Sequence, residues 1–243
     1  DMRQTPTTCP YCGCGCTLVL NVRDNRVVKV TADVSRGLPG GMLCVKGRFG
    51  MGFLSSTDRL TQPLIRRDGT LQPAGWDEAL DLVARRLGEL RDAYGPDAVG
   101  VLASAKCTNE ENYVLQRFAR AVVGTNNVDH CARLCHASTV AGLARAFGSG
   151  AMTNSIADFD ATDCIFVIGS NTTECHPIIG SAILRAVQRR RTKLIVADPR
   201  RIELAERAQL HLRQRGGSDV ALVNAMIHVI LRDDLADREF IAE

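Results

Sequence analysis

The sequence predicts an α/β protein in which a small cysteine-rich β domain precedes α/β units built on a mostly parallel sheet. Two β-rich runs lie between cysteines in the first fifty residues, and further on apolar runs of strand length alternate with amphipathic helices. The hydrophobic set makes up 45% of the 243 residues, with 30 Lys and Arg against 27 Asp and Glu. This composition excludes a disordered or collagen-like chain, and a net charge of +3 gives no basic surface for nucleic acid.

The amino-terminal region predicts a β-hairpin. Residues 17–22 and 26–31 are rich in β-branched and apolar side chains, and they flank Asp24 and Asn25. Asp and Asn are typical of tight turns because they tolerate a left-handed backbone.

A second hairpin and a long helix are expected next. Residues 63–73 contain Asp68-Gly69, a turn pair. Residues 76–94 predict an amphipathic helix that ends at Gly95, because apolar side chains recur at helical spacing. These side chains are Leu80, Val83, Leu87 and Leu90.

The remaining chain alternates between strand and helix. A buried type of strand is expected at 99–103, and Thr108 with Glu111 forms a capping box for a helix that reaches Gly124. After residue 160 the expected elements are strand 164–168, helix 177–190, strand 194–197, a short helix at 201–207, a strand at 209–212 and helix 218–231. This alternation predicts a parallel sheet with helices on both faces.

Three segments are therefore expected: a cluster-bearing domain at 1–60, an α/β segment at 61–130 and a dinucleotide-binding-like α/β segment at 131–243. The arginine run at 189–191 is expected to be a solvated helix end. No membrane span is expected, since the most apolar stretch, 220–231, falls well short of the ~20 residues needed to cross a bilayer.

Cysteine dominates the chemistry of the amino-terminal region. Cys9, Cys12, Cys14 and Cys16 lie too close in sequence to pair with one another without strain, and Cys44 follows after a gap. A 4Fe-4S cluster needs four thiolates, usually three from a tight loop and one from a distance, whereas zinc more often uses two Cys-x-x-Cys pairs. The spacing therefore favours iron and sulfur, leaves Cys14 and Cys16 as alternatives for the third ligand, and predicts a reducing cytoplasm.

Polar residues and glycines follow the predicted strands near the carboxyl terminus. They occur at 169–174, at 198–200 and at 216–219. Ligands of open α/β sheets bind outside the carboxyl ends of the strands, and helix N-termini accept phosphates, so a dinucleotide fits there. The chain has no GxGxxG motif, so an ordinary NAD site is not supported. Each residue alone is also typical of a cap or a turn.

Three motifs carry a resemblance to a known family: TCPYCGCGC at 8–16, CVKGRFG at 44–50 and GTNNVDHCARLCHAS at 124–138. They resemble the amino-terminal portion of the large (alpha) subunit of molybdenum or tungsten formate dehydrogenases, within the bis-molybdopterin guanine dinucleotide oxidoreductases. The resemblance covers essentially the whole chain. Members of that family are several hundred residues longer, which implies that this chain is a fragment, a truncated form or one part of a split subunit.

The resemblance implies a role for each amino-terminal motif residue. It implies that a 4Fe-4S cluster is held by Cys9, Cys12, Cys16 and Cys44. Cys14 is then an extra thiol. Lys46 is expected between the cluster and the pterin on the electron path, where a cation offsets buried negative charge. Without the motif, a lone lysine is normally a solvated surface charge.

The resemblance also implies that Cys135 binds molybdenum or tungsten and that His136 assists the removal of hydrogen from formate. A thiolate is a soft ligand, and histidine titrates near neutrality. By itself a Cys-His dipeptide is more typical of a packed thiol beside a surface imidazole. Arg133 holds formate or a pterin phosphate in one interpretation and forms a structural salt bridge in the other, with equal weight.

The guanosine diphosphate end of one pterin is expected at the strand ends. The first contacts implied are Asn171, Glu174, Asp198, Arg200 and Asp219, and the further ones are Gly169, Cys175, His176, Pro199 and Gly217.

The implied reaction is the oxidation of formate to carbon dioxide, with two electrons passed through the 4Fe-4S cluster. The implied partners are the remainder of the catalytic subunit and an electron-transfer subunit or domain. Two alternatives stay open. One is another bis-molybdopterin oxidoreductase such as an assimilatory nitrate reductase, which generally lacks the histidine after the metal ligand. The other is a non-catalytic iron-sulfur electron-transfer module. The sequence does not choose between molybdenum and tungsten, nor does it identify the electron acceptor or the oligomeric state.

Overall fold

The computed structural model describes residues 1–35 and 41–242. Contacts divide the chain into two compact units, which we call the first unit (residues 1–51 and 154–243) and the second unit (residues 52–153). The first unit thus joins the two ends of the sequence, a grouping that differs from the three consecutive segments at 1–60, 61–130 and 131–243. Those segment boundaries stay a prediction.

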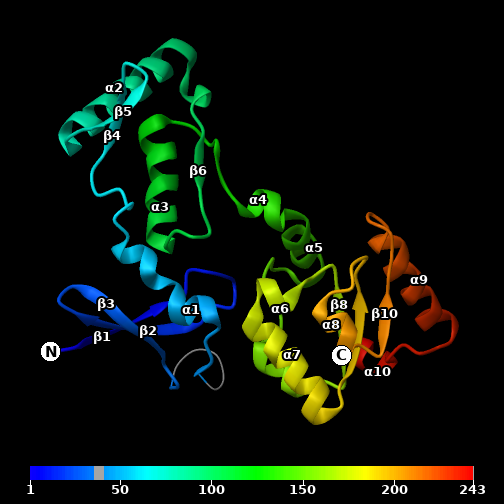
Figure 1. The fold of residues 1–243 in the computed structure, drawn as a ribbon. Helices are drawn as coiled ribbons and strands as arrows, with labels where there is room; N and C mark the ends of the chain where they lie inside the picture. The colour runs from blue at the N-terminus through cyan, green and yellow to red at the C-terminus, as the bar shows by residue number, and fades with distance from the viewer. Residues whose placement is uncertain (36–40, 243) are drawn as a thin grey trace. The chain divides into compact units, whose positions relative to one another are not determined.

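An antiparallel sheet opens the first unit (Figure 1). Its strands are β1 (Arg3–Thr8), β2 (Thr17–Arg23) and β3 (Arg26–Ala32), in the order β1-β2-β3. The predicted hairpin is confirmed, with Asp24 and Asn25 both at positive φ. β1 was not expected, because its side chains are polar and all exposed. The short helix α1 (Val45–Phe49) follows, and then a 3-10 turn, η2 (Gly50–Ser55).

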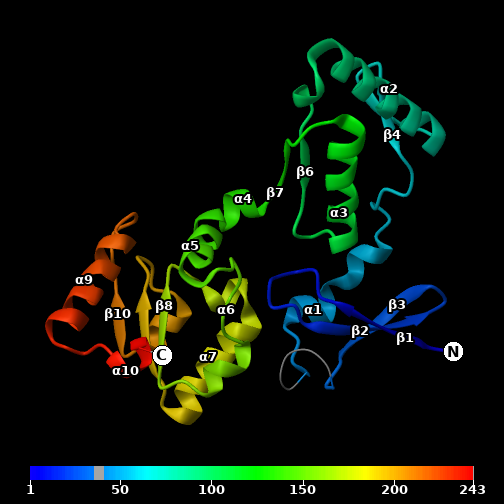
Figure 2. The same ribbon diagram turned by 180° about the vertical axis from the view of Figure 1, so that it is seen from behind.

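A parallel sheet forms the rest of the first unit. Its strands, in the order β10-β9-β8, are β8 (Cys164–Ile168), β9 (Lys193–Ala197) and β10 (Leu210–Leu212). The helical elements are η5 (Ile156–Asp160), α6 (Thr172–Cys175), α7 (Pro177–Arg190), α8 (Glu203–Arg207), α9 (Asp219–Arg232) and α10 (Arg238–Ala242). Figure 2 shows α7 on the side of β8 and α9 beyond β10. The predicted strands and helices of this region are confirmed, and so is the solvated arginine run at the end of α7.

The core of this sheet is supplied by β8, β9, α7 and α8. Its buried side chains are Ile165, Val167, Ile183, Ala186, Leu194, Val196, Ile202 and Leu204. By contrast α9 buries no residue, although it is strongly apolar, and Val220 and Leu231 are well exposed. The expectation that helices cover both faces of the sheet is therefore met only in part.

The second unit holds a hairpin, a parallel strand pair and four helices. In chain order its elements are β4 (Leu64–Arg67), β5 (Thr70–Pro73), α2 (Trp76–Tyr94), η3 (Pro96–Ala98), β6 (Val101–Ala103), α3 (Asn109–Phe118), the π turn η4 (Ala119–Val123), β7 (Val128–His130), α4 (Ala132–Cys135) and α5 (Ala137–Phe147). The hairpin, α2 and the capping box at Thr108 are confirmed.

Two expectations for the second unit need correction. The strand expected at 99–103 is shorter, and Leu102 is 87% exposed, so the strand is not of the buried type. The apolar stripe of α2 predicts the helix correctly, but no α2 residue is buried in this chain. Within residues 1–35 and 41–242, no helix is long and apolar enough to cross a membrane.

Candidate functional site

The amino-terminal cysteines gather in one apolar cluster of the first unit. Cys9, Cys14 and Cys16 are buried, and Cys12 and Cys44 are partly buried against them. The same cluster contains Leu18, Val30, Met51 and Ile178. Residues from the hairpin, from the turn before α1 and from the start of α7 thus enclose the five thiols. All ten cysteines of the chain are free.

The cysteine loop closes by continuing the β1-β2 ladder. The Cys9 N–H donates to the Cys16 carbonyl at 2.8 Å, directly after the last ladder pair of Thr8 with Thr17. Gly15 lies at φ +64, a left-handed conformation that side chains rarely adopt, so the tight return needs a glycine. A Cβ at Gly47 would lie 3.6 Å from Cys9 Sγ, so the backbone of α1 lies close to the thiols.

The electrostatic surroundings of Cys16 differ from those of Cys14. Burial is the largest cause that raises the pKa of Cys16 to about 11, and the neighbouring thiols of Cys9, Cys12 and Cys44 contribute to this increase. Burial also raises the pKa of Cys14 to about 11, but the groups that act on Cys14 are Ile179, Cys12 and Cys16. Cys16 is therefore close to each of the other three predicted cluster ligands, whereas Cys14 faces α7.

The chemistry of these thiols suits an iron-sulfur cluster. Among the described residues, no group of three His, Cys, Asp or Glu side chains is arranged to hold a single metal ion. A 4Fe-4S cluster is a larger body and holds its four thiolates further apart. The donor set of four soft thiols suits such a cluster.

Lys46 lies in the first turn of α1, two residues after Cys44, and its side chain is exposed. The Arg48 N–H donates to the Cys44 carbonyl at 3.0 Å, which ties Cys44 into the start of this helix. A positively charged side chain thus lies two residues after Cys44, the predicted fourth cluster ligand.

Cys135 and His136 lie in the second unit, at the junction of two helices. Cys135 ends α4, and His136 has a non-helical backbone between α4 and α5. Both side chains are exposed. Arg133 Nε donates to Asp129 Oδ2 at 2.5 Å, and this hydrogen bond lowers the pKa of Asp129. In this chain Arg133 therefore forms a salt bridge, one of its two expected roles.

The strand-end residues share one edge of the parallel sheet. The Gly169 N–H donates to the Ala197 carbonyl at 2.9 Å, and the Asp198 N–H donates to the Leu212 carbonyl at 3.0 Å. Asp198 is 3% exposed, and its Oδ1 accepts from the Arg200 N–H at 2.8 Å. A buried carboxylate therefore lies at the carboxyl ends of β9 and β10, whereas Pro199 and Arg200 are exposed beside it.

The turn after β8 leads from this edge to the cysteines. Asn171 begins α6, and its carbonyl accepts from the N–H groups of Glu174 at 3.2 Å and Cys175 at 3.0 Å. A Cβ at Gly13 would lie 3.9 Å from His176 Nε2. His176 thus lies against the cysteine loop, a neighbour not expected from the sequence.

One polar residue at this edge was missed. In the loop after β10, Gln214 Nε2 donates to Asp219 Oδ1 at 2.8 Å, and Gly217 has a positive φ. Gln214 Oε1 is buried and has no hydrogen-bond partner among the described residues. A buried acceptor without a donor is costly unless a ligand or water satisfies it. Glutamine in a loop carries no sequence signal that distinguishes it from a solvated side chain.

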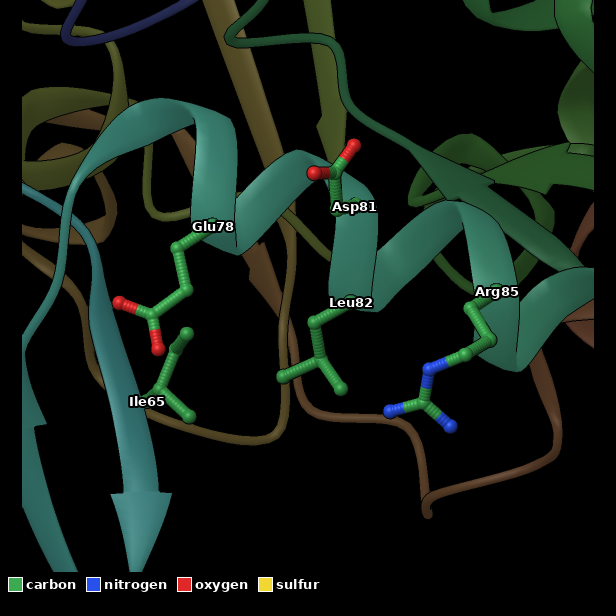
Figure 3. Close-up of a pocket in the computed structure, with 5 residues that line it drawn as sticks. All are labelled: Ile65, Glu78, Asp81, Leu82 and Arg85. Carbon is green, nitrogen blue, oxygen red and sulfur yellow. The ribbon is translucent and has the colours of Figure 1, made fainter.

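A shallow groove in the second unit is not part of these sites. It has a volume of about 560 Å³ and lies between β4 and α2. Figure 3 shows Glu78, Leu82 and Arg85 projecting from α2 on the side of Ile65, whereas Asp81 points away. None of the predicted site residues lines it.

Comparisons with known proteins match the whole arrangement. The family model described as Molybdopterin oxidoreductase Fe4S4 domain matches residues 2–56, and the model described as Molybdopterin oxidoreductase matches residues 59–241. The first model therefore spans all five clustered cysteines, and the second spans Cys135 and the strand-end residues.

Curated relatives and a solved structure extend this match. F420-dependent formate dehydrogenase 1 subunit alpha of Methanococcus maripaludis is 50% identical over 235 residues, which is 97% of this chain and 34% of the relative. Formate dehydrogenase H of Escherichia coli is 46% identical over 249 residues, which is 99% of this chain and 34% of the relative. Acetylene hydratase from Pelobacter acetylenicus superposes with a TM-score of 0.79 at 28% identity, covering 98% of this chain and 33% of that one. The chain spans about a third of the length of these relatives. The match to the solved structure confirms the expected α/β fold.

Proposed function

The chain belongs to the molybdopterin oxidoreductase family, and from this premise we propose that it is part of the catalytic subunit of a molybdenum- or tungsten-dependent formate dehydrogenase. The reaction is the oxidation of formate to carbon dioxide. The observation that carries this proposal is the Cys135-His136 pair, which stands at an exposed helix junction in a chain 46–50% identical to relatives named formate dehydrogenase. The fold alone would not select the reaction, because a hydratase shares it.

The metal-binding residues are assigned by chemistry. Cys9, Cys12, Cys16 and Cys44 hold the 4Fe-4S cluster, a choice supported by the position of Cys16 among the other three thiols. Cys135 supplies the thiolate for molybdenum or tungsten. When bound, the metal and its pterins supply the two-electron chemistry, and the cluster carries electrons one at a time.

The remaining residues bind, orient and move charge. His136 accepts the proton that formate loses on oxidation, and it binds this proton at an imidazole nitrogen. Lys46 places a cation beside the cluster ligands, which offsets negative charge there. Arg133 binds formate or a phosphate only if it exchanges Asp129 for that anion, since its guanidinium is already paired.

The strand-end edge of the first unit receives the guanosine diphosphate of one pterin. Asp198 offers a buried carboxylate to the guanine or ribose, and Gln214 Oε1 offers a buried acceptor that lacks a donor. Asn171, Glu174, Arg200 and Asp219 border the same edge, as do Gly169, Cys175, His176, Pro199 and Gly217. The orphaned Gln214 acceptor supports a ligand at this place.

The proposed setting is a larger assembly in a reducing cytoplasm. Relatives named as alpha subunits support partner subunits for the complete enzyme. Ten free thiols in one chain suit a reducing compartment.

The test uses the complete enzyme that contains this chain. Formate-dependent dye reduction should be lost in Cys135→Ala, while cluster iron stays at the native level. Cys131→Ser is the matched control, because Cys131 is another exposed thiol one helical turn earlier. Formate turnover retained in Cys135→Ala would refute the assigned site.

Two further measurements separate the alternatives. Turnover of nitrate without turnover of formate would favour a nitrate reductase. Iron without molybdenum, tungsten or extractable pterin would favour a non-catalytic iron-sulfur module.

A further inference from the structure

Tyr11 joins the cysteine loop to the end of α1. It lies between Cys9 and Cys12 in the sequence, and its hydroxyl donates a hydrogen bond to the carbonyl of Gly50, 39 residues further along the chain. The Tyr11 side chain is partly buried and packs against the apolar cluster that contains the thiols. The assignment of the cluster ligands gives no role to this side chain.

The close approach of Tyr11 explains why residue 50 is a glycine. A Cβ at Gly50 would lie 2.8 Å from Cζ and 3.0 Å from Cε2 of the Tyr11 ring. The backbone of Gly50 has φ −82 and ψ 7, and a negative φ does not by itself favour glycine. The missing side chain therefore makes room for the tyrosine ring, which lies directly against the backbone of Gly50.

The hydrogen bond from Tyr11 acts on Cys44 through one short helix. Cys44 lies immediately before α1, and its carbonyl accepts from the Arg48 N–H at 3.0 Å. At the other end of α1, the Gly50 N–H donates to the Lys46 carbonyl. Because α1 is short and both of its ends are hydrogen-bonded into the helix, the positions of Gly50 and Cys44 depend on each other.

We propose that Tyr11 is a positioning residue of the cluster: its hydrogen bond to the Gly50 carbonyl fixes α1 against the cysteine loop and keeps Cys44 at its iron. The inference rests on the cluster assigned under the proposed function, in which Cys44 is the one ligand outside the loop. The loop itself is closed by its own backbone, since the Cys9 N–H donates to the Cys16 carbonyl at 2.8 Å. Cys44 needs a contact between separate segments, and Tyr11 supplies one.

Release of Cys44 has a defined chemical result. The 2+ form of a 4Fe-4S cluster that loses one thiolate gives one electron to an oxidant and one Fe²⁺ to solution, which leaves a 3Fe-4S cluster of charge 1+. This product is bound by the three thiolates of the loop and is an intermediate in the loss of the whole cluster. Its appearance therefore reports on Cys44 separately from the loop.

The experiment follows the cluster of the complete enzyme during oxidation by ferricyanide, with ferrozine present to bind the released Fe²⁺. Tyr11→Phe keeps the ring and removes the hydroxyl. Release of the first iron should become about 2- to 10-fold faster, the range that one net hydrogen bond permits. The electron paramagnetic resonance signal of a 3Fe-4S cluster should appear at the same faster rate. Tyr94→Phe, which removes an exposed hydroxyl of the second unit, should leave both rates native.

A second variant disturbs the same contact from its other side. In Gly50→Ala the added methyl group meets the Tyr11 ring, so the ring or α1 must move, and iron release should again be faster than in the native enzyme. Gly52→Ala is the matched control in the same turn, because a Cβ there would meet nothing within 4 Å.

The outcomes separate this inference from the proposed function. Native rates of iron release in both Tyr11→Phe and Gly50→Ala overturn the role of Tyr11, and so does equally fast release in Gly50→Ala and Gly52→Ala. Faster release without a 3Fe-4S signal also overturns it, because the loop ligands would then be the ones released. A native enzyme with no 4Fe-4S signal refutes the cluster, and the role of Tyr11 with it. None of these measurements uses formate, so the loss of the formate assignment alone leaves this test intact.

Discussion

The cysteine loop and the Cys135 segment are both predicted metal-binding regions, but the chain builds them differently. In the loop, five thiols are buried or half-buried among side chains from three parts of the first unit. At the α4-α5 junction of the second unit, Cys135 and its neighbours Leu134 and His136 are exposed, and Leu134 is 95% exposed.

This difference shows how much of each region is enclosed by packing within the chain itself. A cluster held by four thiolates of one unit is enclosed by local packing, so the apolar side chains already surround the site. A metal that receives one ligand from the chain and the others from pterins needs that ligand to be accessible. Cys135 is exposed, whereas Cys9 and Cys16 are buried by side chains of the chain itself.

The largest predicted effect concerns the cysteine loop alone. Cys44→Ala removes the one assigned cluster ligand that lies outside the loop, and three thiolates cannot complete the set of four. We expect loss of the cluster, measured as iron and acid-labile sulfide per chain. Cys164→Ala is the control, and native iron content in Cys44→Ala would contradict the assigned ligand set.

The second prediction concerns the Cys135 segment and leaves the cysteine loop unchanged. His136→Gln removes the titratable group beside Cys135, and turnover of formate should fall by about 10²- to 10⁴-fold. Iron content should stay native. His228→Gln, on the exposed face of α9, is the control. An unchanged rate of formate turnover in His136→Gln would show that His136 takes no part in the mechanism.

The third prediction tests the support of the cysteine loop. A Cβ at Gly180 of α7 would lie 2.8 Å from the backbone Cα of Thr173, so the α6-α7 junction must shift in Gly180→Ala. We expect a loss of about 1–3 kcal/mol in the free energy of unfolding, measured by denaturant titration.

A glycine of the second unit provides the matched comparison. Gly88 lies within α2, and a Cβ there would meet nothing within 4 Å. Gly88→Ala should therefore stabilise the chain by up to about 1 kcal/mol, because alanine is the better helix former. Equal effects of Gly88→Ala and Gly180→Ala would show that α7 is not closely packed against α6.

The smallest predicted effect concerns the ion pair between η5 and α7. Two hydrogen bonds from Arg185 lower the pKa of Asp160 below its ordinary 3.8. A lowered carboxyl pKa contributes stability above the unfolded pKa, and this contribution disappears as the pH falls through the folded pKa. Asp160→Asn should therefore lower the melting temperature slightly near neutral pH.

The pH dependence of this difference is the measurement. The native chain and Asp160→Asn should converge as the pH falls below about 4. A difference that persists at lower pH would assign the effect to packing instead of charge.

Periodicity and turn chemistry predicted the fold well where they are strong. Runs of β-branched and apolar residues gave β2, β3, β8 and β9, and the 3.6-residue period gave α2 and α7 to within a residue. β1 was missed because its stability comes from pairing with β2, and its own sequence, RQTPTT, is polar. α6 and β7 were missed because they are short and begin in polar turns.

The candidate site was predictable in its residues but not in its environment. Spacing left Cys14 and Cys16 equivalent, because only the fold brings Cys9, Cys12 and Cys44 around Cys16. The approach of His176 to Gly13, and the buried acceptor of Gln214, depend on contacts between distant parts of the chain. The exposed apolar face of α2 has the same cause, since periodicity predicts a helix but not what covers it.

The contribution of Ile178 to the cysteine cluster has a consequence for biosynthesis. The ribosome completes the cysteine motifs early, but Ile178 emerges more than a hundred residues later, after several seconds or more at about 5–20 residues per second. Until then the nascent cysteine loop lacks the apolar cover that Ile178 provides. The order of synthesis thus places the five thiols well before one of the side chains that buries them.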